Sequence, residues 1–107
     1  MQGVEVALED LGMTFKGHDV LLTTEDGLCT PPGGGTAGQK LAADSTLVGL
    51  IGPSCSDEVV GGIAAVTAAG LTTISPSATR PALTDPALPN GRDETYAGFL
   101  RTAHSDA

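Results

Sequence analysis

Apolar residues recur along the chain with two different spacings, and each spacing predicts one kind of element. Spacings of three and four residues are typical of an amphipathic helix, whereas short and nearly continuous apolar runs are typical of buried strands. The helical spacing predicts helices over residues 1–13, 36–44 and 56–69. The apolar runs predict strands over residues 18–25, 47–52, 71–75 and 97–102.

The order of these elements predicts the fold class. Strands that alternate with helices favour an α/β fold with a parallel sheet. The run 47–52 is apolar at nearly every position, which is typical of a strand that is covered on both faces. We therefore expect a three-layer arrangement, in which helices flank both faces of a parallel sheet.

Proline and glycine mark the connections between the elements. Residues 26–35 hold two prolines and four glycines and are predicted to form a loop. Four prolines oppose regular structure over most of residues 76–89. The stretch GGGTAGQK resembles a phosphate-binding loop, but Gln39 stands where that loop needs lysine, and Lys40 comes one residue late. No nucleotide and no other cofactor is therefore predicted.

Length and charge limit the functions open to the chain. A chain of 107 residues is the size of one domain. Thirteen acidic against five basic residues give a net charge of −8, which argues against nucleic acids and anionic membrane surfaces as partners. No apolar stretch approaches the ~18 residues of a membrane-spanning helix, and no signal peptide is recognisable. If the protein is exported, its signal is expected to lie outside this chain.

The two cysteines are Cys29 and Cys55. Their separation allows a disulfide, two buried thiols or part of a metal site. His18 and His104 show no ligand spacing around them, and structural zinc needs four ligands at short spacings, so no metal site is predicted. A disulfide would close a loop of about 26 residues, and the chain-entropy model gives a stabilisation of roughly 3.5 kcal/mol for such a loop. It would also indicate an oxidising compartment.

Hydroxyl groups cluster where two of the predicted strands end. Ser54 and Ser56 follow the strand 47–52, and Ser77 and Thr79 follow Ser75 at the end of the next strand. In an open parallel sheet, ligands bind outside the carboxyl ends of the strands. The helix predicted to begin near Ser56 directs free N–H groups at the same place, which suits a carboxylate. The alternative is that these hydroxyls only cap turns.

The residues give little support for catalysis. Ser54 lies in GPSCS, which resembles a nucleophile elbow but lacks its final glycine. The only candidate bases among the histidines are His18 and His104, and neither belongs to a motif. Neighbouring carboxylates, such as those of Asp57 and Glu58, point apart around a helix. We therefore expect that the protein is not an enzyme.

Five stretches of the chain, taken in order, resemble one protein family. They are GVEVALED, HDVLLTTEDGLC, VGLIGPSCS, ISPSATRPALT and FLRTAHSD. Their order and spacing resemble the periplasmic ligand-binding proteins of ABC transporters. The most similar branch is the branched-chain amino-acid (Leu/Ile/Val) type, which has the type I fold. The resemblance covers nearly the whole chain.

The resemblance implies a set of binding residues. Ser56 matches the residue that binds the ligand's carboxylate in the amino-acid binders. Ser77, Ala78 and Thr79 match a segment that supplies main-chain and hydroxyl contacts, and Thr79 also contacts the ammonium group. With Ser54, which converges on the same place, these residues form the predicted ligand-binding set.

The resemblance also bears on the cysteines and on the extent of the chain. Family members often join the cysteines that match Cys29 and Cys55 in a disulfide. They have two α/β lobes joined by a hinge, and residues 1–107 resemble part of the N-terminal lobe. No stretch matches the second lobe or the first strand, which is expected before Val4. The strand 18–25 thus lacks its usual neighbour, and we expect an unpaired edge through which two copies could form a homodimer.

These implications give one expected function and two alternatives. The first is the solute-binding component of an ABC importer, which captures an amino acid or similar small polar ligand and delivers it to the permease. The resemblance implies a periplasmic or extracellular, membrane-associated location. One alternative is a ligand-sensing receptor domain of the same fold. The other is a truncated fragment that binds nothing.

Overall fold

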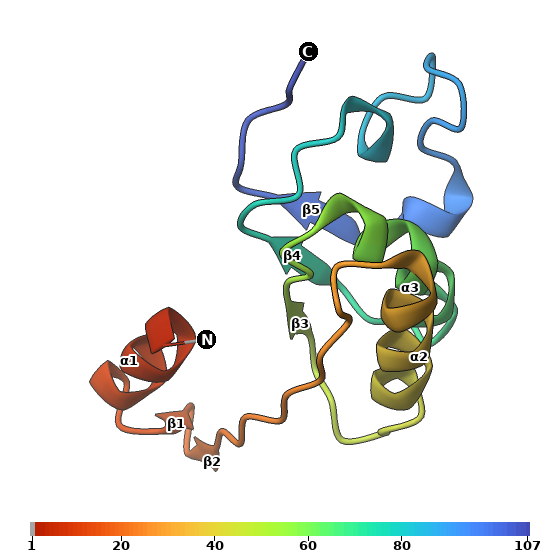
Figure 1. Cartoon of the computed structure of the whole chain (residues 1–107). Helices are drawn as coiled ribbons and strands as arrows, with labels where there is room; N and C mark the ends of the chain where they lie inside the picture. The colour runs from red at the N-terminus through yellow and green to blue at the C-terminus, as the bar shows by residue number, and fades with distance from the viewer. Residues whose placement is uncertain (1) are drawn as a thin grey trace.

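A computed structural model describes residues 2–107 of the chain (Figure 1). Its helices are α1 (Gln2–Asp10), α2 (Pro31–Ala42) and α3 (Ser56–Ala68), with short 3-10 helices η1 (Pro81–Leu83) and η2 (Glu94–Tyr96). Its strands are β1 (Thr14–Phe15), β2 (His18–Asp19), β3 (Leu50–Ile51), β4 (Thr73–Ser75) and β5 (Phe99–Arg101). Strands β3, β4 and β5 form a parallel sheet in that order, whereas β1 and β2 form a separate antiparallel pair. The predicted α/β class with a parallel sheet is therefore confirmed.

Among residues 2–107, the side chains cover one face of the sheet only. Helix α3 packs over that face through a cluster that holds Val59, Ile63 and Phe99, and α2 packs against α3 (Figure 1). On the other face, Ile51, Ile74 and Leu100 form one row across the three strands and are 68%, 41% and 50% exposed. The structure thus has two layers where three were predicted, and the strand within 47–52 is not covered on both faces. Helix α1 does not supply the missing layer, because none of its residues is buried.

Helix α2 begins five residues before the predicted start, inside the predicted loop 26–35. Thr30 caps it, because its Oγ1 accepts a hydrogen bond from Gly33 N at 3.1 Å, and two prolines fill the first turn. Gly34 and Gly38 are buried against α3. A Cβ on Gly38 would lie 2.8 Å from the carbonyl oxygen of Gly62, so the two backbones approach more closely than other side chains allow. The glycines of α3 therefore serve helix-on-helix packing.

The core lies between α3, the sheet and the two 3-10 helices. Its buried side chains are those of Val59, Ile63, Ala78, Leu83, Tyr96 and Phe99. Helix α3 matches the predicted span closely and ends before Gly70, whose φ of +74° is the left-handed conformation expected just beyond a helix. The predicted strands 71–75 and 97–102 appear as β4, which is shorter at its start, and β5, which is shorter at both ends.

Residues 2–25, which we call the arm, lie apart from this body (Figure 1). Of the predicted strand 18–25 only His18–Asp19 is paired, and it pairs with β1 inside the arm. Val20 and the residues up to the loop at Gly27 run without regular structure. The predicted helix 1–13 appears as α1, which ends at Asp10 because residues 11–13 form a turn; residue 1 lies outside the described residues. Within residues 2–107 no helix has the length and apolar character needed to cross a membrane.

Candidate functional site

Three chain segments meet where the parallel strands end, and we call this place the carboxyl edge. They are residues 52–56 after β3, 76–80 after β4 and 102–106 after β5, and they lie together because parallel strands end on one side of a sheet. A main-chain hydrogen bond joins the last two segments, because Asp106 N donates to Thr79 O at 3.1 Å. Thr102 N also donates to Ser75 O, at the end of β4, at 3.0 Å. The carboxyl edge is therefore a surface to which three segments of the chain contribute.

Hydroxyl groups tie the first two segments together. The Ser75 hydroxyl donates to Pro53 O at 2.5 Å, and the Ser77 hydroxyl donates to Ser54 O at 2.9 Å. Arg80 N donates to the Ser56 hydroxyl at 3.2 Å. The structure thus brings the predicted hydroxyl residues into one cluster, although they come from positions more than 20 residues apart in the sequence.

The members of this cluster differ in how far they reach solvent. Ser75 and Ala78 are fully buried. Ala78 can therefore contribute to ligand binding only through its main chain and its neighbours, and not through its own side chain. Ser54 and Ser77 are exposed, and Ser56 and Thr79 are half-buried. The surface that a ligand can reach at the carboxyl edge is therefore formed by these last four residues.

Several hydrogen-bond donors at this surface remain available. Within residues 2–107 the Ser54 hydroxyl has no hydrogen-bond partner, and the Ser56 hydroxyl only accepts, so both protons can be donated. The N–H groups of Ser56 and Asp57, at the start of α3, also make no hydrogen bond in the described part of the chain. A helix N-terminus with two hydroxyls beside it can hold a small anionic group such as a carboxylate.

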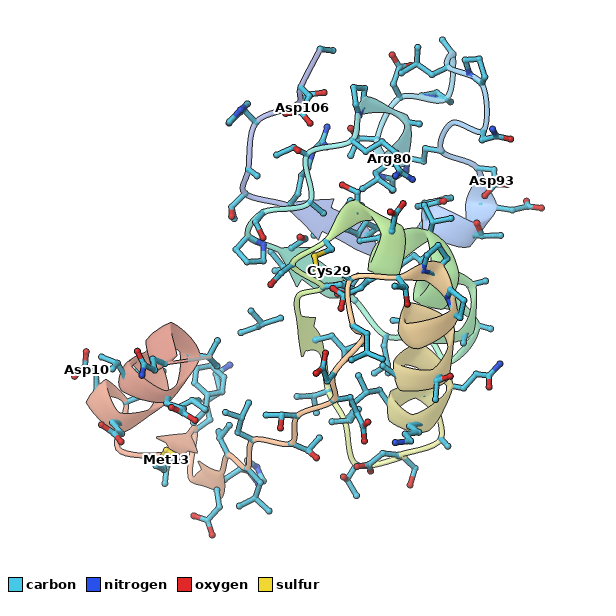
Figure 2. The ribbon with its side chains drawn as sticks, viewed as in Figure 1. Asp10, Met13, Cys29, Arg80, Asp93 and Asp106 are labelled. Carbon is cyan, nitrogen blue, oxygen red and sulfur yellow. A yellow bond between two sulfur atoms is a disulfide. The ribbon has the colours of Figure 1, made fainter. Side chains whose placement is uncertain are left out.

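Acidic and basic side chains surround these donors. Arg80 forms an ion pair with Asp57, so the negative charge in the first turn of α3 is partly neutralised. The Thr79 hydroxyl donates to the carboxylate of Asp106 at 2.5 Å. Figure 2 shows Arg80 and Asp106 at the same end of the body. The carboxyl edge therefore offers donors for an anion on α3 and an acidic oxygen for a cation at Asp106.

Arg101 holds the segment 76–80 in place, and its role was not expected from the sequence. Arg101 donates from Nη1 to Ala78 O at 3.2 Å and to Arg80 O at 3.0 Å, and from Nη2 to Thr84 Oγ1 at 2.6 Å. These bonds connect the end of β5 to the loop after β4. A single arginine at a strand end gives no signal of this role in a sequence.

The disulfide lies directly beside the carboxyl edge. Cys29 and Cys55 are joined, with their Cα atoms 5.3 Å apart, which confirms the pairing (Figure 2). Cys55 is the residue that precedes α3. The alternatives of two thiols or a partial metal site do not apply to this state, since each sulfur is bonded to the other. The disulfide therefore fixes the start of α3 to the loop that precedes α2.

A buried carboxylate supports the same junction. Glu58 is only 8% exposed, and its oxygens accept hydrogen bonds from Cys29 N at 3.1 Å and Cys55 N at 3.2 Å. Gly27 packs against this carboxylate so closely that a Cβ there would lie 2.5 Å from Glu58 Oε1. The sequence indicated only that Glu58 and its neighbour Asp57 point apart around a helix. The structure shows that Glu58 points inward and connects both cysteine main chains.

The two histidines lie in different parts of the structure. His18 is in β2 of the arm, and His104 is in the exposed segment after β5 (Figure 1). Neither makes a side-chain hydrogen bond to another described residue. The expectation that the protein is not an enzyme remains a prediction.

No protein-family model, no curated protein and no solved structure matches this chain.

Proposed function

We propose that this chain belongs to a solute-binding protein of an ABC importer, of the branched-chain amino-acid type, and captures an amino acid or similar small polar ligand at the carboxyl edge. The observation that carries this proposal is the juxtaposition of Ser54 and Ser56, at the start of α3, with Ser77 and Thr79. Two turns that are distant in the sequence form one polar surface there, as binding at the strand ends requires.

The donors on α3 suit the ligand's carboxylate. The hydroxyls of Ser54 and Ser56 and the main-chain N–H groups of Ser56 and Asp57 supply several donors at the positive end of a helix. The two carboxylates of the first turn are both engaged within the chain, so neither occupies these donors. Glu58 is buried against the cysteine main chains, and Asp57 is paired with Arg80.

The other end of the cluster suits the ligand's ammonium group. The Thr79 oxygen and the carboxylate of Asp106 lie side by side and are both acceptors that an ammonium group can contact. A zwitterion that spans from α3 to Asp106 would therefore match the charge of each end. In the proposed family a second lobe closes over the ligand, and contacts from such a lobe would add to those of this chain.

The disulfide supports an extracytoplasmic location. Disulfides persist in oxidising compartments such as the periplasm and the cell surface and are rare in the cytosol. The Cys29–Cys55 bond holds α3 and its free N–H groups in place. A periplasmic or extracellular protein that delivers its ligand to a membrane permease would meet this condition.

A calorimetric titration with a panel of the common amino acids tests the proposal. We expect saturable binding by the native chain, loss of at least about tenfold in affinity in Ser56→Ala and in Thr79→Ala, and no loss in Ser45→Ala. Ser45 is exposed and lies in the loop after α2, so its substitution is a matched control. A chain that is folded by circular dichroism and binds none of the panel contradicts the proposal.

A second candidate is a domain whose carboxyl edge binds nothing. The observation that favours it is that the hydroxyls of Ser75, Ser77 and Thr79 already donate within the chain. Turn capping alone explains those three groups. It does not explain the unused donors of Ser54 and Ser56, which is why we prefer a binding function.

A further inference from the structure

Three side chains of the kinds that bind metal ions meet where α3 begins. They are Cys29, Cys55 and Glu58, and the two sulfur atoms and one carboxylate oxygen all lie within 4.8 Å of one another. In this structure the sulfurs are bonded to each other, so neither binds an ion. Reduction would return two cysteine side chains to the same place, and their thiolate form is a metal ligand.

The Glu58 carboxylate is held in an orientation that suits a metal ligand. One of its oxygens accepts a hydrogen bond from Cys29 N at 3.1 Å, and the other accepts one from Cys55 N at 3.2 Å. A carboxylate has about four lone-pair sites, so about two of them remain free. Carboxylates that bind metals are themselves hydrogen-bonded, because these bonds fix their orientation. Here the main chains of both cysteines supply such bonds.

Contacts other than the disulfide keep the two cysteines close together. Glu58 connects their N–H groups, and α2 packs on α3 so tightly that a Cβ on Gly34 would lie 2.3 Å from Glu58 O. The Cα atoms of the cysteines are 5.3 Å apart. Two thiolates on one tetrahedral zinc ion lie about 3.8 Å apart, which side-chain rotation alone can provide. We therefore expect both sulfurs to stay within reach of one ion after reduction.

Exposure and charge allow a cation to enter this cluster. Cys29 is exposed, Cys55 is half-buried and Glu58 lies beneath them at 8% exposure. The net charge of −8 attracts cations to the chain. Two thiolates favour zinc over the hard ions magnesium and calcium. Three protein ligands would leave a fourth tetrahedral position for water on the exposed side.

We propose that the reduced chain binds one Zn²⁺ ion through Cys29, Cys55 and Glu58, and that the disulfide closes this site. A dithiol opens it by thiol–disulfide exchange. One thiolate of the dithiol attacks Sγ of the exposed Cys29, the bond to Cys55 breaks, and the second thiol of the dithiol then displaces Cys29. The cysteines gain two electrons and two protons, and the dithiol becomes a disulfide. Zinc then replaces the two thiol protons, which pass to water. This inference does not depend on the ligand proposed above.

A competition titration against a chromogenic zinc chelator tests the site. The chain is reduced with a phosphine, because a dithiol would itself bind zinc. We expect one Zn²⁺ per reduced chain and none in the disulfide form. Glu58→Gln should weaken zinc binding at least about tenfold, and Cys29→Ser at least about a hundredfold. Asp57→Asn is the matched control, because this neighbouring carboxylate pairs with Arg80, and it should leave the zinc affinity unchanged.

X-ray absorption of the zinc-loaded native chain makes the result independent of how well the variants fold. We expect two sulfur ligands at about 2.3 Å and oxygen ligands at about 2.0–2.2 Å. Zinc should also raise the unfolding temperature of the reduced chain and leave that of the disulfide form unchanged. The proposal is overturned if the reduced chain binds no zinc at about 0.1 mM, or if the disulfide form binds it equally well. Any other number of sulfur ligands, or equal zinc affinities of Glu58→Gln and Asp57→Asn, also overturns it.

Discussion

The hydroxyl of Ser77 donates a hydrogen bond to the main-chain oxygen of Ser54, across 2.9 Å and 23 positions of sequence. This bond joins the turn after β4 to the turn after β3 at the surface of the protein. Beneath it, the buried Ser75 makes a parallel connection to Pro53. The two serines show how the carboxyl edge is assembled: one hydroxyl fixes the turns from inside, and the other lies where a ligand can reach it.

Substitution of Ser75 should loosen this junction. The Ser75 hydroxyl donates to Pro53 O at 2.5 Å and accepts from Ala78 N at 3.0 Å, and the residue is fully buried. Ser75→Ala leaves both main-chain groups without that partner, which should lower the free energy of unfolding by about 1–3 kcal/mol. Urea unfolding followed by circular dichroism measures this. Ser45→Ala should change the value by less than about 0.5 kcal/mol; an equal loss in both variants contradicts the assigned role.

The charge of Glu58 is predicted to stabilise the start of α3. Its two oxygens each accept a main-chain N–H, one from Cys29 and one from Cys55. Glu58→Gln keeps the shape but turns one of these acceptors into a donor that faces an N–H group. The free energy of unfolding should fall by about 2–3 kcal/mol with the disulfide intact.

The neighbouring carboxylate provides the control for that experiment. Asp57 is about half exposed and pairs with Arg80 at the surface, so Asp57→Asn should cost less than about 1 kcal/mol. Comparable losses in Glu58→Gln and Asp57→Asn would show that the helix dipole, and not the buried hydrogen bonds, accounts for the effect of Glu58.

Close packing of α2 on α3 gives a third prediction. A Cβ at Gly38 would lie 2.8 Å from Gly62 O, and main chain cannot yield easily. Gly38→Ala should therefore destabilise the protein by about 1–3 kcal/mol, although alanine favours a helix. Gly3→Ala in α1 is the matched control, because a Cβ there meets nothing within 4 Å, and it should be neutral or slightly stabilising. Thermal unfolding of both variants decides whether the contact is as tight as described.

Tyr96 should make the free energy of unfolding depend on pH in the alkaline range. Burial, together with the negative charge of Asp93, raises the pKa of the Tyr96 phenol above its usual value of about 10. Because the pKa is higher in the folded than in the unfolded chain, this stabilisation is present below pH ~10 and is lost as the pH rises further. Tyr96 is the single tyrosine and the chain has no tryptophan, so absorbance at 295 nm follows it directly. A midpoint at or below 10 in the folded chain contradicts this prediction.

The spacing of apolar residues and the positions of glycine were sufficient to predict the elements that depend on neighbouring residues in the sequence. Val59, Ile63 and Val66 are spaced for one helix face and are buried on α3, and Gly70 marks its end. The strands β4 and β5, which come after α3, were predicted from short apolar runs. The start of α2 could not be predicted in this way. Glycine and proline have poor intrinsic helix propensity, and here the approach of α3 favours glycine over the larger residues that usually build helices.

The features of the candidate site also fall into those that the sequence predicts and those that it does not. Hydroxyls at two strand ends are visible in a sequence, and parallel strands bring them together, so the cluster of Ser54, Ser56, Ser77 and Thr79 could be predicted. The inward carboxylate of Glu58 and the bonds of Arg101 could not. Their partners lie 29 and 23 positions away, and no local pattern specifies such pairings. The open face of the sheet was missed because an apolar strand predicts burial and not what covers it.

The most direct test of the central claim is an amide NMR titration of the ¹⁵N-labelled chain with leucine and with the other common amino acids. If the carboxyl edge binds a zwitterion, the N–H signals of Ser56, Asp57 and residues 77–79 should shift and saturate with at least one ligand. They should stay still in Ser56→Ala at the same ligand concentration. An assigned spectrum in which these signals do not move, or in which only signals elsewhere move, would contradict a ligand site at the carboxyl edge.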